Sequence, residues 1–292
     1  CDTKIYTESR PFDAKARLFR SLIFMPLLQL ALVALIQGIT EFLPVSSSGH
    51  LILLPGLTGY EDHGQVIDVA VHLGTLAAVV IYFWQDVRIG LTGLPRLARG
   101  RADSDGARLA LGLIIATIPT VLFGAALHFS GLSDALRSPA VIGWTMLIFG
   151  IVLYVADQKG AEGKVAQDWG PRDALIMGLW QMIALIPGTS RSGITITGAR
   201  QLGYNREDGA RIAMLMSIPT ILASGVLLGT EVALDADMAL IRDAGIAAAL
   251  AMLSALAALS LMMRLLRSVS FTPYVIYRVI LGLVLLSYAY SG

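Results

Sequence analysis

Six apolar stretches limit what this chain can fold into. They cover about residues 66–84, 109–128, 139–156, 211–229, 245–264 and 274–290. Each approaches the roughly 20 residues that an α-helix needs to cross the hydrocarbon core of a bilayer. Charged residues make up only 15% of the 292-residue chain, against roughly 25% in soluble domains. The sequence therefore predicts an all-α, polytopic integral membrane protein with six transmembrane helices.

Two further apolar regions, about residues 26–55 and 173–203, are interrupted near their middles by polar runs. The first run, residues 41–50, reads EFLPVSSSGH, and the second, residues 187–195, reads PGTSRSGIT. Irregular backbone at membrane depth is tolerated only where it is buried in protein or lines a cavity. We therefore expect two re-entrant helix–loop–helix hairpins whose breaks share one polar pocket.

Loop charges predict the orientation, because loops rich in Lys and Arg stay on the cytoplasmic side. Basic residues concentrate at 85–108, 159–172 and 264–267, whereas residues 230–243 are mainly acidic. With the basic loops inside, the six spans alternate without conflict and both termini lie outside. The first hairpin then enters from outside and the second from the cytoplasm, an arrangement typical of the inverted-topology repeats of transporters.

Weak internal similarity accompanies this arrangement. A Gln precedes a Gly by twelve residues in both interrupted regions, at 37–49 and at 181–193, and Ile-Pro-Thr recurs at 118–120 and 218–220. Such short matches also arise by chance in an apolar chain. The prediction of two hairpins therefore rests on the polar breaks and not on the repeat.

Composition excludes some classes of function and cofactor. The net charge is +1 and the basic residues fall in separate loops, so the chain lacks the continuous basic surface that tracks a nucleic acid. Cys1 is the only cysteine, which excludes an internal disulfide or a cysteine metal cluster. Residues 1–24 are polar, and we expect them to be an extension without a role, followed by one membrane domain over 25–292.

The second polar run has the chemistry of an anion site. A half-helix that starts at the break would point its free N–H groups and its positive dipole end into the pocket. Arg191 adds a permanent charge with a donor fork suited to phosphate oxygens. Ser190, Ser192 and Thr195 add hydroxyl donors. Small residues also serve close helix packing in membranes, which would explain the serines but not the arginine.

The first polar run offers groups for hydrolysis. Gln37 and Glu41 lie four residues apart, hence on one helical face, and Ser47 and His50 follow. Phosphate hydrolysis needs a nucleophile, a proton acceptor and neutralisation of phosphoryl charge, the last often by Mg²⁺ held through carboxylates. Asp68 and His72 form another pair one helical turn apart, which suits either the pocket and a metal or a solvated membrane boundary.

With these residues in hand, about residues 26–290 resemble the BacA family of undecaprenyl-diphosphate phosphatases. Gln37 and Glu41 meet the first signature of the family, Glu or Gln followed by Glu at the fourth position, and the run to His50 continues it. Residues 187–195 meet the second signature, Pro-Gly-x-Ser-Arg-Ser-x-x-Thr, in full.

The resemblance implies hydrolysis of undecaprenyl diphosphate to undecaprenyl phosphate and inorganic phosphate, which recycles the lipid carrier of peptidoglycan precursors. It implies a multi-pass protein of the bacterial inner membrane with a site open to the periplasm, a divalent metal such as Mg²⁺ or Ca²⁺, a link to bacitracin resistance, and a chain that could form a homodimer. Four catalytic roles follow: Ser47 as nucleophile or phosphate ligand, His50 as its acid/base partner, Glu41 as metal-binding or activating carboxylate, and Arg191 as diphosphate clamp. The substrate-binding residues expected around them are Gln37, Ser46, Ser48, Ser190, Ser192 and Thr195.

Two other classes of protein compete with this interpretation. Type-2 phosphatidic acid phosphatases also use Ser-Gly-His and Ser-Arg elements, but they require a histidine after the arginine, and the four histidines of this chain all precede Arg191. A transporter of the undecaprenyl phosphate carrier is the second alternative, since opposed broken hairpins are a transporter architecture. Glu41, Ser47 and His50 beside a phosphate clamp favour hydrolysis, because transport requires no nucleophile. Neither spacing nor resemblance distinguishes a phosphoserine intermediate from direct attack by activated water.

Overall fold

The computed structural model describes residues 11–54, 64–131, 136–232 and 238–291, and within these ranges the chain is all-helical without a β-strand. The α-helices are α1 (Pro11–Phe42), α2 (Ser47–Leu51), α4 (Gly64–Tyr82), α5 (Trp84–Leu97), α6 (Asp105–Ser130), α8 (Pro139–Lys159), α9 (Pro171–Ile183), α10 (Arg191–Gln201), α11 (Arg206–Val232), α12 (Met238–Leu265) and α13 (Thr272–Ser291). A short 3₁₀ helix, η1, covers Ala166–Asp168. Six helices, α4, α6, α8, α11, α12 and α13, are long and apolar enough to cross a membrane, which confirms the six expected spans.

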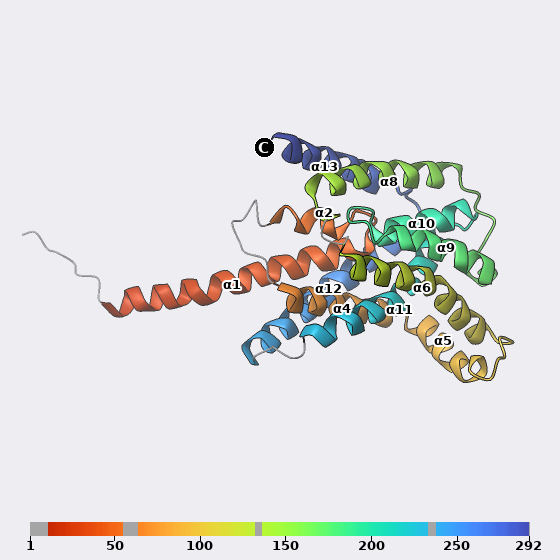
Figure 1. Cartoon of the computed structure of the whole chain (residues 1–292), viewed down its shortest axis with the longest axis horizontal. Helices are drawn as coiled ribbons and strands as arrows, with labels where there is room; N and C mark the ends of the chain where they lie inside the picture. Colours follow the sequence, from red (N-terminus) through yellow and green to blue (C-terminus); the bar gives the residue numbers. More distant parts are fainter. Residues whose placement is uncertain (1–10, 55–63, 132–135, 233–237, 292) are drawn as a thin grey trace, which may run out of the picture.

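The helices form two groups around the shorter helices. Helices α8 and α13 pack side by side along the upper edge of Figure 1, and α4, α11 and α12 lie together below. Helices α9 and α10 lie between the groups, with α9 packed on α6 and α10 packed on both α8 and α11. The broken segments are therefore enclosed by protein, as irregular backbone in a bilayer must be.

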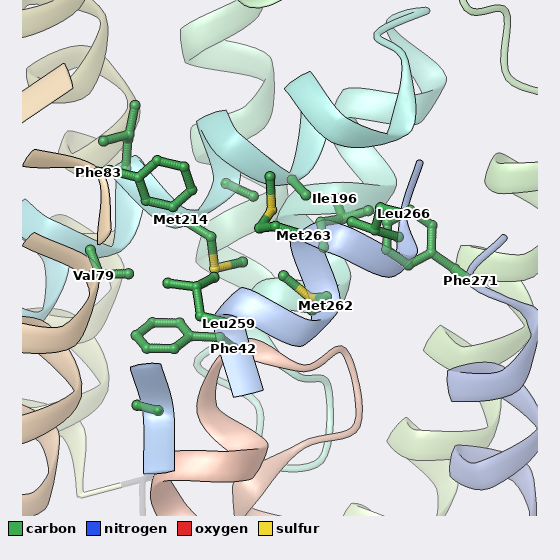
Figure 2. Packing of buried hydrophobic residues seen from close by; sticks show 14 of the residues in the cluster. Phe42, Val79, Phe83, Ile196, Met214, Leu259, Met262, Met263, Leu266 and Phe271 are labelled. Carbon is green, nitrogen blue, oxygen red and sulfur yellow. The ribbon is translucent and has the colours of Figure 1, made fainter. Parts of the chain in front are cut away.

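The largest apolar core lies directly beside the first break (Figure 2). Phe42, the last residue of α1, is fully buried together with Met214 of α11, Leu259 and Met262 of α12, and Phe271 just before α13. Unbranched methionines fill irregular gaps between helices that meet at different angles. This packing fixes the position at which α1 ends and hence the backbone that follows Phe42.

One sequence expectation differs from the observed helices. Helix α1, which begins at Pro11, runs through the position between residues 24 and 25 without a break, and the division into an extension and a membrane domain stays a prediction. Residues 85–108, expected as a loop because of their charge, include most of helix α5, which packs on α6. Gly93 and Gly106 allow this packing, since a Cβ on Gly93 would lie 2.1 Å from the carbonyl carbon of Gly106.

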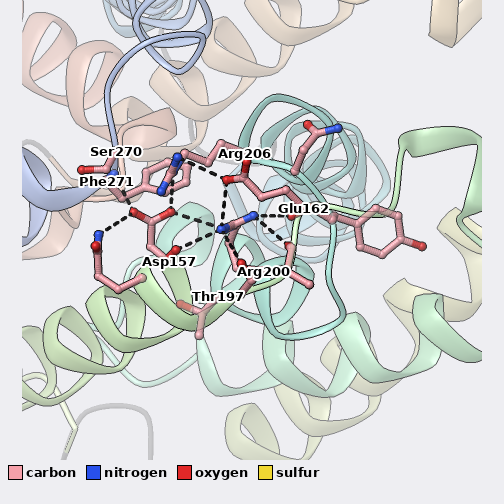
Figure 3. Close-up of polar contacts among 12 residues, drawn as sticks. Asp157, Glu162, Thr197, Arg200, Arg206, Ser270 and Phe271 are labelled. Atoms are coloured by element: carbon pink, nitrogen blue, oxygen red, sulfur yellow. Dashed lines mark hydrogen bonds and ion pairs between the residues drawn. The ribbon is translucent and has the colours of Figure 1, made fainter.

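A buried polar network joins the C-terminal ends of α8 and α10 to the start of α11 (Figure 3). Asp157 is 1% exposed, and its Oδ1 accepts a 2.7 Å hydrogen bond from Arg206 Nε and lies 3.3 Å from Arg200 Nε. Asp157 Oδ2 accepts from the backbone N–H of Phe271 at 3.1 Å. Arg200, also 1% exposed, donates to the carbonyls of Asp157 and Tyr204. The buried carboxylate of α8 thus ties the loop before α13 to α8, α10 and α11.

A second polar cluster at the same end joins the loop after α8 to α9. Lys164 Nζ and the Tyr204 hydroxyl each donate to Asp173 Oδ2 at 2.7 Å. Burial, and then the hydrogen bond to Asp173, raise the pKa of the Tyr204 hydroxyl, so it stays a donor. Arg267, in the third basic loop, reaches Glu207 at the start of α11. Loops rich in Lys and Arg therefore gather at one end of the bundle.

We expect Asp157→Ala to destabilise the protein by about 3 kcal/mol, because it removes the buried one of the two carboxylates that Arg200 and Arg206 share and leaves them only Glu162, which is 53% exposed. Asp103→Ala is the matched control, since Asp103 pairs with Arg96 at 3.1 Å but both side chains are more than half exposed. Its loss should cost about 1 kcal/mol or less. Thermal unfolding of the detergent-purified variants checks this prediction, and equal Tm values for the two would contradict it.

Candidate functional site

The two breaks have the same local backbone geometry. Helix α2 starts after Ser46 and α10 starts after Ser190, and these N-cap serines have φ of 72° and 68° with ψ of 104° and 111°. Among the described residues they are the only non-glycine residues with positive φ. Such a conformation costs about 1–3 kcal/mol and persists only where surrounding contacts enforce it.

Hydrogen bonds hold the two breaks against each other. The backbone N–H of Gly188 donates to Ser48 Oγ at 3.0 Å, and Ser192 Oγ donates to the carbonyl of Leu43 at 3.0 Å. Ser190 Oγ caps its own helix by accepting from the N–H of Gly193 at 3.2 Å. The chain thus brings together two loops about 140 residues apart in sequence.

Gly188 is required where the second break meets α8. Its φ is +86°, and a Cβ there would lie 2.1 Å from Thr145 Oγ1 and 2.5 Å from the carbonyl oxygen of Ile142. Thr145 Oγ1 also donates to the carbonyl of Pro187 at 2.6 Å. The loop therefore rests directly on the backbone of α8, and a residue with a side chain would push it away.

Both breaks line one cavity of about 810 Å³, as the sequence analysis expected. Its walls come from α1, α4, α6, α8 and α11 as well as from the two breaks. Polar side chains line the cavity at the two breaks and also along α1, α4, α6, α9 and α11, with apolar side chains between them. Its polar lining consists of Gln29, Gln37, Thr40, Glu41, Ser46, Ser47, Ser48, Asp68, His72, Thr120, Arg137, Gln181, Ser190, Arg191, Thr220 and Ser224.

An ion pair between Glu41 and Arg191 joins the two breaks inside this cavity. Arg191 NH2 donates to Glu41 Oε1 at 2.9 Å, and the two side chains are only 13% and 9% exposed. Gln37 Nε2 donates to Glu41 Oε2 at 2.8 Å, and Ser47 Oγ lies 3.4 Å from the same oxygen. Arg191 NH1 is buried without a partner. Because an unsatisfied buried donor is costly, an anionic oxygen that accepted from it would be stabilised.

His72 completes a polar centre that also contains Gln37, Glu41, Ser47 and Arg191. Its Nδ1 lies 2.6 Å from the carbonyl oxygen of Asp68, and since a carbonyl only accepts, Nδ1 carries the proton. Nε2 is then free to accept from Gln37 Nε2 at 3.1 Å, and it lies 4.0 Å from Glu41 Oε2. Asp68 and His72 both line the cavity, so the structure favours the pocket over the membrane boundary for this pair.

His50 faces away from the other expected catalytic residues. Its Nδ1 lies 2.7 Å from the carbonyl of Ser46, its Nε2 lies 2.7 Å from the hydroxyl of Tyr277, and its ring stacks on Tyr277. His50 is not among the residues that line the cavity. The spacing after Ser47 suggested an acid/base pair, but the ring turns back to the carbonyl four residues earlier and toward α13.

Two of the expected hydroxyl donors are also used by the protein itself. Ser192 donates to Leu43, and Thr195 Oγ1 donates to the carbonyl of Arg191 at 2.8 Å within α10. Neither lines the cavity. The other expected site residues all line it: Gln37, Glu41, Ser46, Ser47, Ser48, Ser190 and Arg191.

Sequence reasoning missed further cavity residues. Gln181 is fully buried, and its Nε2 donates to Thr220 Oγ1 at 3.0 Å and to Thr120 Oγ1 at 3.3 Å. These threonines end the two Ile-Pro-Thr repeats, so the repeat was a usable signal. Arg137, an exposed residue in the connection between α6 and α8, also lines the cavity, but no repeat or motif in the sequence marks it.

The site fits a metal ion only if the substrate supplies most of the ligands. The described ranges contain no group of three or more His, Cys, Asp or Glu side chains around one point. Glu41 is the central carboxylate, and the buried Gln37 Oε1 beside it has no partner and adds an oxygen. Mg²⁺ commonly binds through one or two protein oxygens together with substrate phosphates and water.

The fold and the site together define a class: a multi-pass membrane protein with an internal cavity equipped to hold an anionic group. The comparison with known families is more specific. A family model described as bacitracin resistance protein BacA matches residues 30–284, and the chain belongs to this family. The matched region contains every residue of the cavity lining except Gln29.

Similar proteins of known name agree with this assignment. A protein of Ruegeria sp. strain TM1040, named undecaprenyl-diphosphatase, is 80% identical over 267 residues, which cover 91% of this chain and all of that protein. A protein of the same name from Ruegeria pomeroyi is 75% identical over the same shares. Undecaprenyl-diphosphatase 1 of Rhodospirillum rubrum is 47% identical over 279 residues, 92% of this chain and 97% of that protein.

We expect Gly188→Ala to destabilise the protein more than Gly131→Ala. Both glycines have positive φ, so each alanine carries a backbone cost of about 1 kcal/mol. Only at Gly188 would the added Cβ also collide with α8, whereas the space around Gly131 is open. Thermal unfolding of the two purified variants measures the difference. A Gly188→Ala protein as stable as Gly131→Ala would show that the loop does not depend on this contact.

Proposed function

We propose that this protein hydrolyses undecaprenyl diphosphate to undecaprenyl phosphate and inorganic phosphate, and so recycles the lipid carrier of peptidoglycan precursors. The observation that carries the proposal is the buried Glu41–Arg191 pair, with Ser47 beside its carboxylate, in a cavity lined by both helix breaks. The names of relatives up to 80% identical support the same activity. An apolar cavity wall suits a lipid substrate, and the polar breaks suit its head group.

Arg191 and the start of α10 would bind the terminal phosphate. The unpartnered NH1 of Arg191 supplies a charged donor, and Ser190, which lines the cavity, supplies a hydroxyl. Phosphoryl transfer depends mainly on positioning and on neutralising the negative charge spread over the phosphoryl oxygens. Ser46 and Ser48 line the same wall from the first break and complete the set of substrate-binding hydroxyls.

Glu41 is the proton acceptor in either of two reaction routes. In the first, Ser47 Oγ attacks the terminal phosphorus, the bond to the bridging oxygen breaks, undecaprenyl phosphate leaves and the Ser47 proton passes to Glu41. Water then hydrolyses the phosphoserine. In the second, a water attacks the phosphorus directly and gives its proton to Glu41, while the bond to the bridging oxygen breaks and undecaprenyl phosphate leaves. Gln37 orients the carboxylate in both, since it donates to the oxygen that faces Ser47.

The roles of three expected residues change with this geometry. His50, Ser192 and Thr195 lie off the cavity, and their side chains bond to backbone carbonyls or to Tyr277. We assign them to shaping the two breaks, while Ser47, Glu41 and Arg191 carry the chemistry. His72, which lies near both Gln37 and Glu41, joins the polar centre in place of His50.

A divalent cation, Mg²⁺ or Ca²⁺, belongs to this proposal. Glu41 and Gln37 Oε1 would hold it together with oxygens of the diphosphate. When bound, the ion adds positive charge to the phosphoryl oxygens and so lowers the barrier to displacement. The absence of a dedicated protein cage among the described residues favours an ion that arrives with the substrate.

We also propose that the site opens to the periplasmic side of the inner membrane. Basic loops gather at the end held by Asp157 and Asp173, which supports a cytoplasmic location for that end. The cavity lining extends instead toward Arg137, in the connection between the other ends of α6 and α8. The similar φ and ψ of Ser46 and Ser190 support two re-entrant hairpins related as an inverted repeat. The homodimer stays a prediction.

Phosphate release from undecaprenyl diphosphate tests the activity directly. We expect release by the detergent-purified protein with Mg²⁺ or Ca²⁺, loss of release with a chelator, and about a 10³-fold lower rate in Arg191→Ala, because the phosphoryl charge loses its clamp. Arg88→Ala, an exposed arginine on α5, is the matched control and should retain the full rate. A folded wild-type protein that releases no phosphate with any metal would favour the transporter alternative.

Ser47→Ala distinguishes the two reaction routes. If Ser47 is the nucleophile, the variant should lose at least about 10³-fold in rate, and rapid acid quench of the wild type should yield a phosphorylated peptide containing Ser47. Ser260→Ala, which removes an exposed hydroxyl of α12 outside the cavity, serves as the control and should retain the full rate. A Ser47→Ala protein with a substantial rate and a wild type without phosphoserine would establish attack by water.

A further inference from the structure

A second arginine lies behind the loop that carries Arg191. Arg278, in the membrane-spanning helix α13, is fully buried. Its NH2 donates to the carbonyl of Thr189 at 2.8 Å and to that of Gly188 at 3.2 Å. These two carbonyls belong to the backbone immediately before Ser190 and Arg191. Arg278, which does not line the cavity, therefore holds the second break through its backbone.

Arg278 has no carboxylate partner among the described residues. No ion pair includes it, and its Nε and NH1 are buried without a hydrogen-bond partner. The other fully buried arginine, Arg200, lies 3.3 Å from Asp157. A guanidinium stays charged in proteins, and a buried charge is normally paired. The unpaired charge of Arg278 is therefore an exception, and an anion bound nearby would stabilise it.

The geometry places this charge next to the proposed phosphate site. A Cβ built on Gly193 would lie 2.7 Å from Arg278 NH1 and 3.2 Å from Ser190 Oγ. The guanidinium and the Ser190 hydroxyl thus flank the same point in the first turn of α10. Ser190 lines the cavity and Arg278 does not, so the charge lies beside a cavity-lining residue without facing the cavity itself.

The charges that line the cavity cancel without Arg278. Glu41 and Asp68 contribute two negative charges, and Arg137 and Arg191 contribute two positive ones. Glu41 moreover already occupies one nitrogen of Arg191. A diphosphate carries several negative charges, which such a balanced lining would not attract. Among the charges of the protein itself, Arg278 adds the one that makes the region positive before a cation binds, and inside protein this charge is screened less than in water.

Arg278 also orients the backbone of the loop. In a planar trans peptide the C=O and the following N–H point in opposite directions. Because the Thr189 carbonyl is held by Arg278, the N–H of Ser190 points away from Arg278. The same contact therefore fixes the direction of a backbone donor in a residue that lines the cavity.

We propose that Arg278 is a positioning residue that gives the phosphate site its net positive charge through the Gly188–Ser190 backbone, without contacting the substrate. The proposal rests on the phosphatase function proposed above. It predicts that the charge of Arg278, and not merely its hydrogen bonds, determines the affinity for a diphosphate.

Two substitutions separate charge from hydrogen bonding. Arg278→Gln keeps an N–H donor for the carbonyls and removes the charge, whereas Arg278→Lys keeps the charge and loses the planar fork. The probe is methylenediphosphonate, a diphosphate analogue that resists hydrolysis, titrated into the full-length, detergent-purified protein by calorimetry. We expect the Kd to rise at least about tenfold in Arg278→Gln and to stay within about threefold of wild type in Arg278→Lys. The KM for undecaprenyl diphosphate should follow the Kd.

Arg200→Gln is the matched control, because it also removes a fully buried arginine that donates to carbonyls. It should lower the Tm and leave the Kd for methylenediphosphonate unchanged. Wild-type affinity in Arg278→Gln would overturn the inference, as would a folded Arg278→Lys protein that has lost binding. If Arg278→Gln does not fold, the lysine variant decides alone. A wild-type protein that neither binds the probe nor releases phosphate would overturn the proposed function itself.

Discussion

The ion pair between Glu41 and Arg191 is the interaction on which the site depends. The two residues lie 150 positions apart, each at the end of a broken helix, and their contact closes two otherwise separate segments around one cavity. A carboxylate or guanidinium alone at this depth would be strongly unfavourable. Each therefore requires the other, and the hydroxyls and backbone N–H groups of both breaks are brought together as a result.

Buried arginines serve two purposes in this bundle. Arg200 is surrounded by carbonyls and by Asp157, so its charge is used within the protein to hold the ends of helices together. The one Arg200 nitrogen without a hydrogen bond, Nε, lies 3.3 Å from the Asp157 carboxylate, whereas Arg191 NH1 and the Nε and NH1 of Arg278 are buried without a hydrogen-bond partner beside the second break. The end of the molecule around Arg200 is thus held together by its own charges, whereas the arginines at the second break have N–H groups available to an anion.

Much of this arrangement could be predicted from the sequence, because the dominant signals are local. Apolar length defines the six spans, and Pro and Ser in apolar surroundings mark the breaks at residues 43–46 and 184–190. The direction of a side chain is not local: His50 turns to Tyr277, 227 residues away. Arg278 interrupts an apolar stretch as a single charge, a signal that was present in the sequence but was not used. Its partners belong to a distant loop, and only the structure identifies them.

The serines at positive φ have a consequence for how the cavity receives a ligand. Glycine would reach this backbone shape freely, whereas Ser46 and Ser190 reach it only because neighbouring contacts hold them there. Loops held in this way before any ligand arrives lose little conformational entropy on binding. The two breaks are thus preorganised, and the affinity they provide is reduced little by the cost of ordering the backbone.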